Sequence, residues 1–107
     1  MSVDFDIESI EGFDWDKGNI DKNFKKHKVI YQEAEEIFNN EPYVFEDIKH
    51  SLKEERLQAL GKTNQGRLLF VSFTVREIGA ALKIRVISAR DVNKKEEVKY
   101  EKIQSNT

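Results

Sequence analysis

The sequence predicts an α+β protein in which helices pack on an antiparallel β-sheet. Its 107 residues are 38% hydrophobic and 36% charged, a balance typical of one globular domain with a well-solvated surface. Apolar residues recur with a helical period in the first 40 residues and with a strand period after Pro42, the only proline. A last helical segment follows the strands. The expected order is two helices, an antiparallel sheet and one C-terminal helix.

Residues 1–12 are interpreted as an N-terminal extension, and residues 13–107 as a single domain. Val3, Phe5 and Ile7 alternate with acidic residues in the extension, which leaves a short edge strand and a frayed tail both open. A first short strand is expected at residues 13–15.

Two helices are expected between this strand and Pro42. Asp16 is a suitable N-cap for a helix that runs to about Lys28. A second helix is expected at residues 31–39, because four apolar residues share one face at the spacing i, i+4, i+7 and i+8: Ile30, Ala34, Ile37 and Phe38.

Four strands are expected after Pro42, at residues 43–45, 55–62, 67–75 and 83–89. The third of these is almost continuously hydrophobic, which predicts the centre of the sheet. Residues 63–66 end in a glycine and form a hairpin connection, and residues 78–81 form the next turn. Asn93 and Glu96 have the spacing of a capping box and predict a final helix to about Lys102.

The composition argues against several function classes. The chain has no cysteine, which excludes disulfides and thiolate metal sites. His27 and His50 are too far apart to form a local zinc motif, and the sequence has neither a glycine-rich phosphate loop nor a serine nucleophile elbow. No metal or cofactor is therefore expected. The chain has no apolar run of membrane-spanning length and begins with acidic residues, so that a cytoplasmic location is expected.

Charge is distributed unevenly along the chain. Residues 1–48 carry 13 acidic and 5 basic side chains, whereas residues 49–107 carry 7 acidic and 13 basic ones. A basic C-terminal half would suit a surface that binds phosphate groups. A scattered, solvated charge distribution is the alternative.

Arginines within the predicted sheet are the first candidate site. Arg56 and Arg85 alternate with apolar residues and should point away from the apolar layer, while Arg67 opens the central strand and Arg90 ends the last one. Guanidinium groups gathered on one face would bind phosphate oxygens. Ordinary surface arginines, paired with Glu54 or Glu55, are the alternative.

His27 is the second candidate. Neighbouring cations, Lys26 among them, favour its neutral form and suit it to act as a general base, whereas the end of a helix favours imidazolium. It also borders the apolar face of its helix, so that a buried structural histidine is the alternative. Trp15 and Tyr100 offer rings for stacking on bases or for packing in the core.

Three ordered segments carry a resemblance to a known family. Residues 13–27 resemble the opening motif, residues 55–71 the central hairpin and residues 85–101 the closing signature of BrnT-type ribonuclease toxins. The resemblance covers residues 13–102 and depends on Trp15, Asp16, Asn23, Lys26, His27, Glu55, Arg56, Gly61, Gly66, Arg67, Arg85, Arg90, Lys95, Glu96, Tyr100 and Glu101.

The resemblance implies a RelE-like ribonuclease fold, with a compact antiparallel sheet, two N-terminal helices and one C-terminal helix. It also implies a type II toxin, an endoribonuclease that cleaves RNA and arrests translation. A BrnA-type DNA-binding antitoxin would neutralise it, and the chain would reach operator DNA only through that complex. A catalytically inactive binding module, acting through the antitoxin in operon autoregulation, is the alternative.

The expected mechanism is metal-independent RNA cleavage. Arg67 and Arg85 would stabilise the charge that develops on phosphorus, His27 with Lys26 would transfer protons, and Arg56, Arg90 and Tyr100 would bind RNA. The chain departs from the family at Lys28, where glycine is usual. Lys28 would either adopt the left-handed conformation, with modest strain, or end the helix differently.

Overall fold

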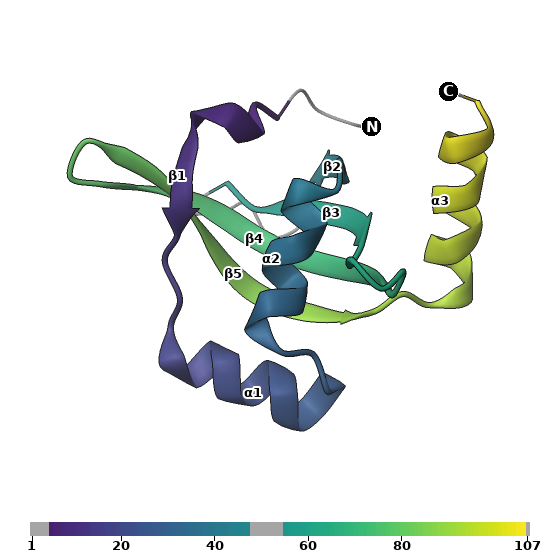
Figure 1. Ribbon diagram of the computed structural model, residues 1–107, viewed down its shortest axis with the longest axis horizontal. Coiled ribbons are helices and arrows are strands. Elements are labelled where there is room, and N and C mark those ends of the chain that lie inside the picture. The colour runs from purple at the N-terminus through teal and green to yellow at the C-terminus, as the bar shows by residue number, and fades with distance from the viewer. Residues whose placement is uncertain (1–4, 48–54, 107) are drawn as a thin grey trace.

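One helix covers one face of a five-stranded sheet, a second lies along an edge of the sheet, and a third packs at one end of the opposite face (Figure 1). The computed structural model describes residues 5–47 and 55–106, so that His50 lies outside the described residues. The helices are α1 (Lys17–His27), α2 (Tyr31–Asn39) and α3 (Lys94–Ser105). Both N-terminal helices and the C-terminal helix are therefore as predicted.

The sheet has the strand order β1-β5-β4-β3-β2, with β4 in the middle, as its hydrophobicity predicted. Its strands are β1 (Ile10–Phe13), β2 (Tyr43–Glu46), β3 (Leu57–Lys62), β4 (Leu68–Ile78) and β5 (Ala81–Asp91). Neighbouring strands from β2 to β5 pair antiparallel, whereas β1 pairs with β5 in parallel. The α+β fold is confirmed, and the sheet is mixed because of this one edge strand.

The first strand lies earlier in the chain than expected. Residues 10–13 pair with β5, whereas the sequence placed a strand at residues 13–15. The reason is that β5 extends to Ala81, which creates an edge beside which Ile10 and Phe13 pack on the core. A short 3₁₀ helix, Ile7–Ser9, precedes β1. Part of the segment interpreted as an extension thus contributes to the sheet.

The covered face of the sheet holds the main core. Ala34, Ile37 and Phe38 of α2 are at most 2% exposed and pack over β4, where Val71 and Phe73 are fully buried. The rings of Phe38 and Phe73 meet edge to face with their centroids 5.0 Å apart. The i, i+4, i+7, i+8 pattern of α2 is explained by this packing.

Helix α1 covers the part of the β5 edge that β1 leaves unpaired. The buried side chain of Asn23 accepts a hydrogen bond from the Ala89 amide, and Asn19 donates one to the Val86 carbonyl, both at 3.3 Å. These asparagines satisfy backbone groups that would otherwise lack a partner. The helix ends at Lys28, which adopts the left-handed conformation with φ 57°. The first of the two alternatives for Lys28 is therefore observed.

Helix α3 begins with the predicted capping box. Asn93 accepts a hydrogen bond from the Glu96 amide at 2.8 Å, and the Glu96 carboxylate accepts one from the Asn93 amide at 3.0 Å. Tyr100 packs with Phe45 and Leu60 in a smaller apolar cluster on the opposite face of the sheet. Across residues 5–47 and 55–106, no helix is both long enough and apolar enough to cross a membrane.

Candidate nucleic-acid interface

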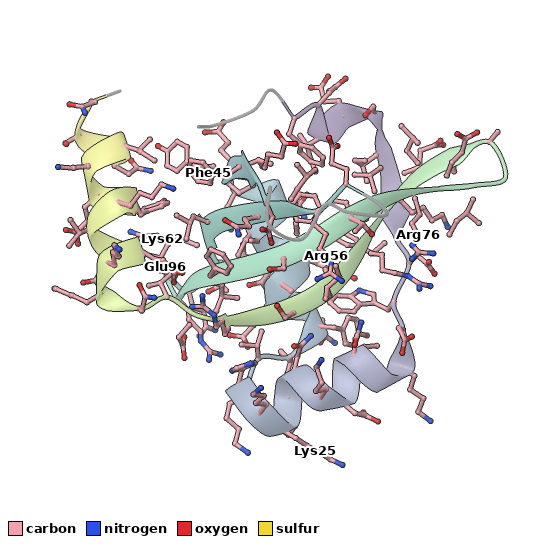
Figure 2. All side chains as sticks on the ribbon, turned by 180° about the vertical axis from the view of Figure 1, so that it is seen from behind. Lys25, Phe45, Arg56, Lys62, Arg76 and Glu96 are labelled. Carbon is pink, nitrogen blue, oxygen red and sulfur yellow. The ribbon has the colours of Figure 1, made fainter. Side chains whose placement is uncertain are left out.

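A groove of about 980 Å³ lies on the face of the sheet opposite α2. Figure 2 shows this face, with Arg56 over the middle of the sheet and Glu96 at the start of α3. We call this hollow the basic groove. Its lining residues come from the strands and from α3: Asp47, Arg56, Gln58, Phe70, Ser72, Ile87, Ser88, Arg90, Lys95, Glu96 and Lys99.

The side chains that come from strands face the groove because alternate residues of a strand point to the same face of the sheet. Gln58 of β3 pairs with Ser72 of β4, which in turn pairs with Ser88 of β5, so that three uncharged polar residues form a row across the sheet. Arg90 is opposite Phe70 in the same ladder. Residues between them in sequence point to the core on the other face.

Charge in the basic groove is predominantly positive. Four cationic side chains, Arg56, Arg90, Lys95 and Lys99, face two carboxylates, those of Asp47 and Glu96. The whole chain has a net charge of −2, so the groove is a local concentration of positive charge. Such a concentration attracts polyanions independently of net charge.

Arg90 lines the groove and is held there by Glu96, by the ring of Phe70 and by the Asp91 carbonyl, to which it donates at 3.1 Å. Its guanidinium donates to both Glu96 oxygens, at 2.8 and 2.9 Å, and lies 4.4 Å from the centre of the Phe70 ring. The hydrogen bond with Glu96 raises the pKa of Arg90 above its ordinary value. Because these contacts fix its plane, Arg90 presents a rigid cation to the groove.

His27 is not part of the groove lining, but it lies near enough to Arg90, which does line the groove, for that charge to affect its pKa. We call this end of α1, with Lys26 and His27, the rim of the groove. Burial lowers the pKa of the half-buried imidazole below its ordinary value of 6.5, and the nearby charges of Lys26 and Arg90 lower it further, against the opposing effect of Asp91. The lowered pKa favours the neutral imidazole, which is one of the two forms that the sequence left open. A neutral imidazole can accept a proton.

Arg67 anchors the end of α1. Its guanidinium donates to Asp91 and Glu33 and also to the carbonyl oxygens of His27 and Lys28, at distances of 2.7 to 3.3 Å. The hydrogen bonds with Asp91 hold the pKa of Arg67 far above its ordinary value. This arginine fixes the backbone that carries His27, and its donors are already engaged by protein oxygens.

The structure brings some predicted site residues together and separates others. Lys26, His27, Arg67 and Arg90 gather around the end of α1, and Arg56 shares the basic groove with Arg90. Arg85 lies apart, about 16 Å from Arg90 along β5. Its guanidinium binds Asp14 at 2.8 Å.

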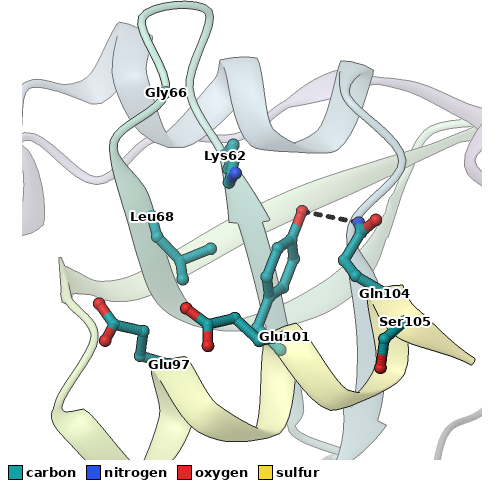
Figure 3. A pocket seen from close by; sticks show the side chains of 8 residues that line it. Lys62, Gly66, Leu68, Glu97, Glu101, Gln104 and Ser105 are labelled. Atoms are coloured by element: carbon teal, nitrogen blue, oxygen red, sulfur yellow. Dashed lines mark hydrogen bonds between the residues drawn. The ribbon is translucent and has the colours of Figure 1, made fainter.

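Tyr100 packs in the core, which was one of its two predicted roles, rather than offering its ring to bases. It is 6% exposed, with Tyr43 and Lys62 against its ring. Its hydroxyl accepts a hydrogen bond from Gln104 at 3.0 Å, the dashed line in Figure 3. The pocket in that view lies between α3 and the start of β4 and is separate from the basic groove. Trp15 also packs in the protein, stacked on Phe13, and donates to Glu35 at 2.7 Å.

Several groove residues were not singled out as site residues from the sequence. Lys95 and Lys99 are four residues apart and therefore share one face of α3. The sequence could have shown this, because the capping box predicted a helix here. Gln58, Ser72 and Ser88 are polar positions between apolar ones on predicted strands. The partners of Arg67, Glu33 and Asp91, left no sequence signal because they come from distant elements.

The fold and the basic groove define a small α+β protein with a surface suited to a phosphodiester substrate. Within the described residues, no group of three or more His, Cys, Asp or Glu side chains is arranged to hold a metal ion.

The family model of the ribonuclease toxin BrnT of type II toxin–antitoxin systems matches residues 15–96. The chain therefore belongs to the BrnT family of ribonuclease toxins. Among solved structures it is similar to the BrnT ribonuclease toxin of Brucella abortus, with 25% sequence identity and a TM-score of 0.55. That match covers 78% of this chain and 97% of the Brucella chain. A search of curated protein sequences gave no match.

Proposed function

We propose that this toxin cleaves RNA in the basic groove without a metal ion, and thereby arrests translation. A BrnA-type antitoxin neutralises it, and the complex of the two proteins binds operator DNA. The observation that carries the proposal is the gathering of Arg56, Arg90, Lys95 and Lys99 around one groove in a chain of net negative charge. Cations arranged in this way bind the phosphates of a nucleic acid.

The chemistry requires four actions at one phosphodiester. The 2′-hydroxyl must lie in line with the bond that breaks, and its proton must be accepted as the 2′-oxygen attacks phosphorus. The charge that develops on the phosphate oxygens must be stabilised, and the departing 5′-oxygen must receive a proton. The products are a cyclic phosphate and a free 5′-hydroxyl.

Arg90 and Arg56 are assigned the stabilisation of phosphate charge. The sequence suggested Arg67 and Arg85 for this role, but neither lines the groove. Arg67 donates to four protein groups and Arg85 is bound to Asp14. Arg67 becomes a positioning residue, because it holds the carbonyl of His27. Arg85 is assigned a phosphate contact farther along the RNA.

His27 is assigned the role of general base, since its lowered pKa favours the neutral form that can accept a proton. Lys26 maintains that state by its positive charge. It also adds a cation at the rim, where an RNA strand leaving the groove would pass.

The test is cleavage of a single-stranded RNA by the purified chain, with and without EDTA. Cleavage that persists in EDTA and is lost in His27→Gln supports the metal-independent mechanism. Cleavage abolished by EDTA would contradict that mechanism and leave the toxin assignment in place. Persistence of the full rate in His27→Gln would contradict the role of His27.

One observation favours the alternative of an inactive binding module. The Glu96 carboxylate occupies two donors of Arg90 that a phosphate would use. Expression of the chain alone separates the two functions. Growth arrest relieved by the antitoxin supports the toxin, and normal growth together with antitoxin binding supports the binding module.

A further inference from the structure

Exposed apolar side chains lie on either side of the connection between α1 and α2. Phe24, Ile30 and Tyr31 are 49%, 44% and 38% exposed. Ile20 lines a crevice together with Ile30 and Tyr31, and it lies one helical turn from Phe24 on the same face of α1. We call these four residues the junction patch. Adjoining exposed apolar groups of this kind are typical of protein–protein contact surfaces.

Helix α1, which carries Ile20 and Phe24 of the junction patch, is rich in positive charge. Residues 17–28 carry five lysines against one aspartate, a net charge of +4 in a chain of net charge −2. Lys28 lies over the ring of Phe24, with Nζ 5.6 Å from the centroid. The neighbouring carboxylates of α2 are engaged within the protein, since Glu33 binds Arg67 and Glu35 accepts from Trp15.

The junction patch adjoins the proposed catalytic histidine. Phe24 and His27 are three residues apart on α1 and therefore lie on neighbouring positions of one helix face. Arg67 fixes the chain here by binding the carbonyls of His27 and Lys28. A partner seated on Phe24 would thus cover the approach to His27 without entering the basic groove.

We propose that the antitoxin docks an amphipathic segment with an acidic flank on the junction patch. Its apolar side chains contact Phe24, Ile30 and Tyr31, its carboxylates face the lysines of α1, and its bulk covers His27. The inference rests on the proposed function, which supplies the antitoxin. A protein fits this surface better than RNA does, because the aliphatic side chains of Ile20 and Ile30 offer nothing to phosphates or sugars.

The experiment measures antitoxin affinity in two patch variants and two matched controls. The antitoxin is the product of the adjacent gene whose co-expression relieves growth arrest. Phe24→Ser and Ile30→Ser alter exposed side chains, and serine is a favoured residue at position 30, the N-cap of α2. The controls, Ile78→Ser and Val98→Ser, remove side chains that are each 44% exposed outside the patch.

We expect the antitoxin Kd to rise about tenfold or more in each patch variant, as at buried apolar anchors, and by less than about twofold in the controls. All four variants should keep the wild-type rate of RNA cleavage. Lys22→Glu combined with Lys25→Glu should slow antitoxin association and weaken its dependence on salt, because both lysines supply attraction at the rim.

If an active antitoxin binds both patch variants with wild-type affinity, the inference is overturned and the proposed function is left in place. Weakened binding of single-stranded RNA, with antitoxin affinity unchanged, would also overturn it and assign the patch to the substrate. If no neighbouring gene product relieved growth arrest, the antitoxin part of the proposed function would fail first, and this inference with it.

Discussion

The two faces of the sheet have opposite chemistry although the same strands build both. On β4, Leu69, Val71 and Phe73 are fully buried on the face that α2 covers, whereas Phe70 and Ser72 line the basic groove. Each strand therefore supplies the core with one set of residues and the groove with the set between them. Substitutions at neighbouring positions of one strand should therefore affect either the stability of the protein or the binding of substrate, but not both.

The largest expected effect is on the covered face. Phe73→Ala should lower the free energy of unfolding by about 3–5 kcal/mol, because it opens a cavity among fully buried side chains. Urea denaturation monitored by circular dichroism measures the change.

Its matched variant is Ser72→Ala, one residue away on the groove face. We expect the free energy of unfolding to change by less than about 0.5 kcal/mol. A loss of stability in Ser72→Ala as large as that in Phe73→Ala would remove the distinction between the two faces.

Two arginines sharpen the comparison. Arg67→Ala should cost about 2 kcal/mol of stability, because it leaves Glu33, Asp91 and two carbonyls without their shared donor. Arg90→Ala should cost about 1 kcal/mol, because a single carboxylate loses its partner. Urea denaturation of the two variants side by side checks the order. Equal stability of Arg67→Ala and wild type would show that Arg67 does not anchor α1.

The pH dependence of cleavage tests the rim of the groove. His27 has a pKa below 6.5 and must be neutral to accept a proton, so the rate should be level near pH 7 and fall as the pH drops through this pKa. Well below it, the fall should approach about tenfold per pH unit. Single-turnover rates between about pH 5 and pH 8 measure the profile.

Lys26→Gln provides the control for this profile. Removing that positive charge should raise the pKa of His27 and move the fall in rate to higher pH. A rate independent of pH below neutrality would exclude His27 as the base.

The smallest expected effect concerns the end of α1. Lys28 has φ 57°, a conformation that favours glycine, so Lys28→Gly should stabilise the protein by roughly 0.5–1 kcal/mol. Thermal unfolding should show a corresponding rise in Tm. A decrease in Tm would mean that the contact of Lys28 with Phe24 outweighs the backbone strain.

Much of the fold could be predicted from the sequence because its signals are local. The spacing in α2, the N-cap Asp16 and the Asn93–Glu96 capping box each depend on residues within a few positions, and all are observed. The parallel pairing of β1 was not predictable in this way, because it depends on the length of β5, which is some 70 residues distant in the chain.

The candidate site was predictable only in part, for the same reason. Residue type indicated the arginines and His27, but their separate roles depend on partners from distant elements. Arg67 meets Glu33 and Asp91, and Arg85 meets Asp14, across separations of 24 to 71 residues. Tyr100 shows the same limit, because its burial follows from how α3 packs on the sheet.

The most direct test of the central claim is the single-turnover rate of RNA cleavage by Arg90→Ala, compared with Arg85→Ala. If the basic groove is the site of cleavage, Arg90→Ala should lose about 10²–10³ in rate, as on removal of a well-placed donor to developing charge. Arg85→Ala should lose less, because Arg85 lies outside the groove lining. Cleavage by a folded Arg90→Ala variant at the wild-type rate would contradict the assignment of the groove.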